Sequence, residues 1–134
     1  MNSFAAPASP ARSTPSLIFI GLVLWALGVL VLRLAVGGGW LDNPLSLAGF
    51  YALTVVGTWP LIPLITRLAG LPRTATVEAT ALVCGTAVTI DGLVIGFAPW
   101  IYASDIADAK AVAGTLLWAI GVALILGFVR RPAA

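Results

Sequence analysis

The sequence has no histidine and a single cysteine, Cys84, in 134 residues. Without histidine, the chain has neither an imidazole base nor an imidazole metal ligand. One cysteine cannot form a disulfide within the chain, and we interpret it as a small buried residue. The sequence also has no glycine-rich phosphate loop, metal-ligand motif or nucleophile elbow. We therefore predict a protein that is not an enzyme, with no catalytic residues, no metal site and no cofactor.

Charge is scarce as well, and apolar residues take its place. Only 9% of the residues are charged, whereas 60% are hydrophobic and the mean hydropathy is +1.08. A helix needs about 20 mostly apolar residues to cross the hydrocarbon core of a bilayer. Four segments meet this requirement, near residues 16–36, 45–69, 76–98 and 111–129. The sequence predicts an all-α polytopic membrane protein, with four transmembrane helices in an up-down bundle.

The two ends of the chain differ from the apolar part in composition. Residues 1–15 are rich in proline, serine and alanine, which predicts a disordered cytoplasmic tail. Residues 16–131 form the transmembrane domain, and residues 132–134 form a short second tail. A cleaved signal peptide over residues 1–37 is the alternative, because Arg12 precedes the first apolar segment and small residues follow it.

The distribution of Lys and Arg predicts the orientation in the membrane. With four spans, one side carries five of the seven basic residues, namely Arg12, Arg67, Arg73, Arg130 and Arg131. The other side carries Arg33 and Lys110. Basic residues are enriched on the cytoplasmic side, so both termini are expected in the cytoplasm. The net charge of +2 is then explained by orientation, and no nucleic-acid partner is predicted.

Polar residues near the ends of the predicted spans are interpreted as helix caps. Asn43 followed by Pro44 is typical of an N-cap with proline at the first helical position. Ser104, with Asp105 and Asp108 after it, predicts a second cap with acidic residues near the positive end of the helix dipole. A metal site at these two aspartates is disfavoured, because hard cations need several oxygen ligands.

One aspartate has no such explanation. Asp91 lies in the apolar run VTIDGLVIGF, residues 88–97. Counted from residue 76, it is roughly 22 Å into the third span, far inside the apolar zone. Arg33, counted from residue 16, is roughly 25 Å into the first span. The two side chains are therefore expected at nearly one depth.

Three interpretations of Asp91 follow from this estimate. The first is an Arg33–Asp91 ion pair that links the first and third spans. The second is a functional site, at which Asp91 binds a proton or a cationic substrate and Arg33 is its release partner. In the third, Arg33 reaches the lipid headgroups by itself and Asp91 is neutral at rest.

Glycines at helical spacing predict places where helices pack closely. Gly92 and Gly96 form a GxxxG pair, which suits close contact with another helix. The full set of candidate packing positions is Gly21, Gly28, Gly85, Gly92, Gly96, Gly114 and Gly121. The similar segments GLVLWALGV (21–29) and GTLLWAIGV (114–122) raise the alternatives of an inverted repeat and of a shared demand for close packing.

The second span contains Pro60 and Pro63. Each proline removes a backbone hydrogen bond and so frees the carbonyls of Val56 and Trp59. We predict a kink here, with Thr58 and nearby polar groups as candidates to satisfy one of the carbonyls.

Several short motifs resemble those of a known group of proteins. They are LRL at 32–34, IDG at 90–92, FAP at 97–99 and LLWAIG at 116–121. Together they resemble an uncharacterised family, a domain of unknown function, of small four-helix bacterial membrane proteins. The resemblance implies a multi-pass protein of the bacterial inner membrane and implies no activity. Small multidrug exporters have a similar length, but they rely on a glutamate in the first span, and this first span has no acidic residue.

Two functions are compatible with these observations. The first is a small, non-catalytic integral membrane protein whose partners are the lipid bilayer and either a second copy or another membrane subunit. The alternative is a small proton- or cation-coupled transporter that uses Asp91. A transporter would need a cavity that reaches this residue, whereas a subunit would tolerate its neutralisation.

Overall fold

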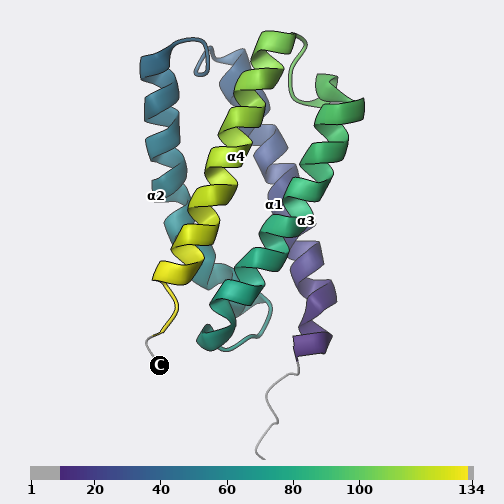
Figure 1. Ribbon diagram of the computed structural model, residues 1–134, viewed down its shortest axis with the longest axis vertical. Coiled ribbons are helices and arrows are strands. Elements are labelled where there is room, and N and C mark those ends of the chain that lie inside the picture. Colours follow the sequence, from purple (N-terminus) through teal and green to yellow (C-terminus); the bar gives the residue numbers. More distant parts are fainter. Residues whose placement is uncertain (1–9, 133–134) are drawn as a thin grey trace, which may run out of the picture.

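The computed structural model describes residues 10–132, which form four long helices and two short 3-10 turns. The elements in chain order are α1 (Pro10–Gly37), α2 (Pro44–Leu68), η1 (Arg73–Ala75), α3 (Thr76–Phe97), η2 (Pro99–Ile101) and α4 (Ile106–Val129). Figure 1 shows the four helices side by side along the long axis, with the first residues of α1 and the last residues of α4 toward the same end of the molecule. The all-helical prediction is confirmed.

Each of the four helices is long and apolar enough to cross a membrane. Their outward faces are also apolar: Phe19 on α1, Val56 on α2, Leu93 on α3 and Leu117 on α4 are each more than half exposed. Water would not favour such a surface, whereas lipid chains would. The fold is thus compatible with a multi-pass membrane protein.

Local sequence explains most of the helix boundaries. The Asn43 side chain accepts hydrogen bonds from the backbone nitrogens of Leu45 and Ser46, at 3.1 and 2.9 Å, and Pro44 opens α2 as expected. α3 ends at Phe97, since the residue before Pro99 is kept out of helical geometry.

Two helices begin earlier than the hydropathy suggested. The cap of α4 is Asp105, whose carboxylate accepts from the backbone nitrogen of Ala107 at 2.6 Å, and the helix starts at Ile106 rather than near residue 111. α1 starts at Pro10 rather than near residue 16. In both cases polar residues extend the helix beyond its apolar segment, so hydropathy alone placed the start too late. The rest of the predicted tail, residues 1–9, lies outside the described residues.

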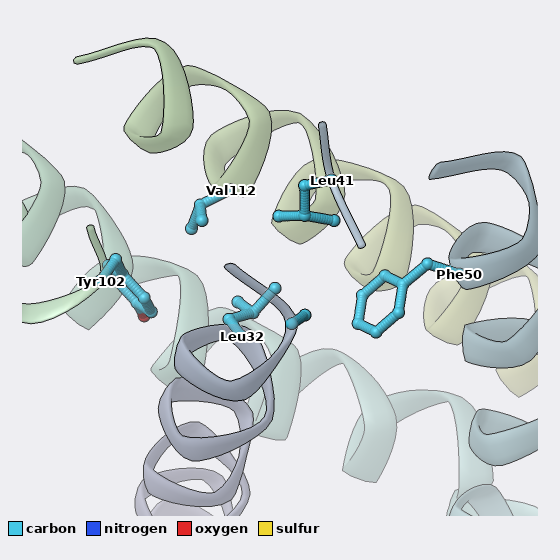
Figure 2. Packing of buried hydrophobic residues seen from close by; sticks show 6 residues of the cluster. Leu32, Leu41, Phe50, Tyr102 and Val112 are labelled. Atoms are coloured by element: carbon cyan, nitrogen blue, oxygen red, sulfur yellow. The ribbon is translucent and has the colours of Figure 1, made fainter. Parts of the chain in front are cut away.

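Two clusters of buried apolar side chains pack the bundle near its two ends. One gathers around Leu32, Leu41, Phe50, Tyr102 and Val112, and Figure 2 shows these side chains pointing toward one another from different segments. The other contains Leu17, Ile65, Ala79 and Val83. The middle of the bundle is less completely filled, and it holds the cavity described below.

Close helix contacts involve fewer glycines than the sequence suggested. A Cβ added at Gly21 would lie 2.9 Å from Thr86 Cβ, so α1 and α3 approach closely there, and at Gly114 it would lie 3.4 Å from the Tyr51 hydroxyl. Apart from chain neighbours and the nearby backbone of the same helix, no described atom lies within 4 Å of such a Cβ at the other candidates, namely Gly28, Gly85, Gly92, Gly96 and Gly121. Within this bundle these five are not packing positions, since equal spacing along a helix does not bring each glycine to a neighbour.

α2 bends along its length (Figure 1) and contains both Pro60 and Pro63. The carbonyl of Trp59, which Pro63 cannot bond, accepts a hydrogen bond from Arg130 Nη1 at 3.1 Å. The same guanidinium lies over the Trp59 ring, 4.6 Å from its centroid. The end of α4 therefore satisfies the carbonyl that the proline frees, and Thr58 makes no such bond in the described part of the chain.

Candidate functional site

The site forms where three segments meet around Asp91. α3 carries Asp91 in its second half, on the face turned toward the bundle interior, so the residue is only 4% exposed. α1 packs mainly on α3 and brings Trp25 beside it. After α3, the turn η2 folds the chain back and buries Tyr102 against the bundle.

These three side chains form one closed hydrogen-bonded group. Trp25 Nε1 donates to Asp91 Oδ1 at 3.0 Å, and the Tyr102 hydroxyl donates to the same oxygen. Trp25 Nε1 also lies 3.1 Å from the Tyr102 hydroxyl oxygen. Both donors are neutral, and the second oxygen, Oδ2, accepts no hydrogen bond from the described residues. The carboxylate is thus held in place without being neutralised by a cation.

Arg33 does not reach Asp91. It is exposed, and its Nη1 donates to the backbone carbonyl of Ile101 at 3.3 Å, while no ion pair joins it to Asp91 among residues 10–132. The link between the first and third helices is instead made by Trp25. The sequence-based depths were offset because α1 starts earlier than assumed. Trp25 is level with Asp91, and Arg33 lies about 12 Å further along the helix axis.

Tyr102 lies between α3 and α4, outside the four candidate spans. Burial, the hydrogen bond to Asp91 and the negative charge of that carboxylate raise the pKa of Tyr102 above its usual range. The phenol therefore stays protonated at neutral pH. Its role in the group is that of a hydrogen-bond donor.

A partly open cavity of about 180 Å³ lies between the four helices, and Asp91 is on its wall. All four helices line it, with three residues between Leu24 and Gly28 on α1, four between Thr58 and Ile65 on α2, five between Thr80 and Asp91 on α3, and four between Leu116 and Ala123 on α4. Most of the described residues that line it are apolar, and no lysine or arginine is among them. Among the described residues, Asp91 is the one carboxyl group on this wall.

The partners of Asp91 were missed by the sequence reasoning. Neither Trp25 nor Tyr102 was identified from the sequence as a partner of this carboxylate. Thr80, which also lines the cavity, was not singled out either. A usable signal for Trp25 and Tyr102 was chemical: a carboxylate in an apolar span needs hydrogen-bond donors, and indole and phenol are donors that an apolar core tolerates.

The fold and site define a class of protein: a bundle of four apolar helices with one acidic group on a central cavity. Comparison with protein-family models, curated proteins and solved structures finds no match to this chain. The geometry of the site is therefore the basis for inferring what the protein does.

Proposed function

We propose that this chain is a small proton- or cation-coupled transporter of the bacterial inner membrane, with Asp91 as the exchangeable group. It crosses the membrane four times with both termini in the cytoplasm. The positive-inside rule supports this orientation, because Arg67, Arg73, Arg130 and Arg131 lie near one end of the bundle and only Arg33 and Lys110 near the other.

The observation that supports transport is the position of Asp91 on the cavity without a cationic partner. An ionised carboxylate at this depth is costly, and two neutral donors offset only part of that cost. Uptake of a proton or a cation from the cavity removes the remaining charge. Coupled transport requires at least one group that alternates between an ionised state and a state with a bound proton or cation, and Asp91 can do so.

Proton flux into proteoliposomes tests this proposal. Purified protein is reconstituted with a pH-sensitive dye inside the vesicles, and dye response is recorded after a pH gradient is imposed. We expect flux above that of empty vesicles, lost in Asp91→Asn. Asp105→Asn is the matched control, since it removes the same charge and asparagine caps helices as well as aspartate does. Equal flux through Asp91→Asn and the unaltered protein would refute transport at this residue.

A non-catalytic membrane subunit is the second candidate, and an exposed face of α3 favours it. Gly85, Gly92 and Gly96 are exposed there with open space around them, so another helix, from a second copy or a different protein, could approach the backbone closely. Affinity purification from mild detergent tests this candidate. A subunit would retain its partner in Asp91→Asn and lose it when Gly92 and Gly96 are both changed to leucine.

A further inference from the structure

Threonines also line the cavity, and one of them, Thr80, is far from Asp91. Thr80 is 1% exposed and lines the same wall, and its hydroxyl oxygen has no hydrogen-bond partner in the described part of the chain. A buried hydroxyl without a partner is uncommon in proteins, because desolvation without a hydrogen bond costs free energy. Asp91 Oδ2 and the Thr80 hydroxyl are thus two polar atoms without a hydrogen-bond partner among the described residues that line this mostly apolar cavity.

The spacing of these two groups sets the shape of what they would bind together. Thr80 and Asp91 lie on one face of α3, and eleven residues of helix separate them by about 16 Å. Apolar side chains from all four helices line the space between them. A ligand that touches both ends must therefore be slender and largely apolar.

The chemistry of the wall selects the charge of the ligand. The negative charge of Asp91 repels anions, and no basic residue among the described lining residues would attract them. A hard inorganic cation needs several oxygen ligands close together. Among the described lining residues, the side-chain oxygens are those of one carboxylate, Asp91, and of the hydroxyls of Thr58 and Thr80, which are too few for such a cation. An organic ammonium group suits the site better, since Asp91 supplies the charge and the adjoining Trp25 ring supplies an aromatic surface.

We propose that the cavity binds a lipophilic primary amine, with its ammonium group on Asp91 and its chain extending along the cavity toward Thr80. This inference rests on the proposed function, because it uses Asp91 as the exchangeable group. When the amine binds, a proton held by Asp91 leaves to water, and the ammonium takes its place. A polar group at the far end of the amine would satisfy the Thr80 hydroxyl.

Calorimetric titration of the protein in lipid nanodiscs tests this inference, with decylamine and its ω-hydroxy analogue as probes. Both amines also partition into lipid, so the matched background is the Asp91→Asn protein in the same nanodiscs. Asparagine keeps an oxygen that accepts from Trp25 and Tyr102, and an unchanged melting temperature shows that the variant is folded. We expect both amines to bind the unaltered protein at least tenfold more tightly than Asp91→Asn.

Thr80→Val examines the other end of the cavity, since valine has nearly the same shape as threonine without the hydroxyl. We expect this variant to bind decylamine as tightly as the unaltered protein does. The unaltered protein should bind the hydroxy amine more tightly than decylamine. In Thr80→Val this ratio of affinities should fall by about fivefold, the factor that one neutral hydrogen bond contributes. An equal preference before and after the substitution would overturn the placement of the chain toward Thr80.

The results separate this inference from the proposed function. Amine binding no tighter than to Asp91→Asn, together with Asp91-dependent proton flux, overturns the inference and leaves the transporter. Asp91-dependent amine binding without flux of protons or of amine overturns the transporter and leaves a binding protein. Absence of both overturns both proposals.

Discussion

The indole nitrogen of Trp25 lies 3.0 Å from the carboxylate oxygen Oδ1 of Asp91, although 66 residues separate the two in the chain. This contact joins α1 to α3 in the middle of the bundle. It also explains how an acidic side chain is kept at that depth without a positive charge beside it. The hydroxyl of Tyr102 completes the arrangement from the connection that follows α3.

The Trp25–Asp91 contact predicts energetic coupling between these residues. Trp25→Phe should destabilise the protein by about 1–3 kcal/mol, because it removes one of two donors to a buried acceptor. In Asp91→Leu the same change should cost less, since the acceptor is gone. Thermal unfolding in detergent of the two single variants and the double variant measures the difference.

Arg33 provides the contrasting cycle. Arg33→Leu and Asp91→Leu should have additive effects within about 0.5 kcal/mol, because Arg33 bonds the carbonyl of Ile101 instead of the carboxylate. Strong coupling in this cycle, with recovery of stability in the double variant, would restore the ion pair expected from the sequence.

Two glycines of α1 should respond in opposite directions to the same substitution. Gly21→Ala should destabilise by about 1–3 kcal/mol, since the new Cβ would lie 2.9 Å from Thr86 Cβ and 3.1 Å from the Val83 carbonyl oxygen. Gly28→Ala has open space and should stabilise by up to about 1 kcal/mol through helix propensity. Melting temperatures of both variants check this, and equal shifts would contradict the close α1–α3 approach.

The hydrogen bond from Arg130 to the Trp59 carbonyl depends on Pro63, which lies four residues after Trp59 and cannot bond that carbonyl. Arg130→Leu should destabilise by about 1 kcal/mol or more, because the Trp59 carbonyl loses its donor. In Pro63→Ala the new backbone N–H can bond that carbonyl, so the arginine change should cost less there. Arg131→Leu is the control, since Arg131 instead lies over the Phe128 ring. Unfolding measurements on these variants would contradict the assignment if the cost of losing Arg130 were the same with and without Pro63.

Tyr102 predicts a loss of stability at high pH. The pKa of Tyr102 is raised in the folded protein, whereas in the unfolded chain it is the usual tyrosine value of about 10. Above that pH the unfolded state binds fewer protons than the folded state, so stability is complete below about pH 10 and falls as the pH rises further. Melting temperatures from pH 8 to pH 11, in roughly one-unit steps, should show this fall in the unaltered protein and a smaller one in Tyr102→Phe.

How much of this was predictable differs between the helices and the site. Hydropathy located all four helices, and the cap at Asn43 was evident from its own side chain and the proline after it. Asp91 was conspicuous because no capping role could explain it. The starts of α1 and α4 were placed too late, because polar residues at a helix end follow the backbone and its caps rather than the apolar pattern.

The sequence by itself determined the elements and the one residue in them that demands an explanation. Each of these depends on composition and spacing within about twenty neighbouring residues. Only the tertiary structure decided which residue meets Asp91. That outcome depends on how far α1 is shifted along α3, and the close contact at Gly21 and the fold of the chain after Pro99 decide it. Sliding α1 by about 12 Å along α3 would place Arg33 instead of Trp25 beside Asp91. The residue pattern within either helix does not indicate how far the two helices are shifted relative to each other.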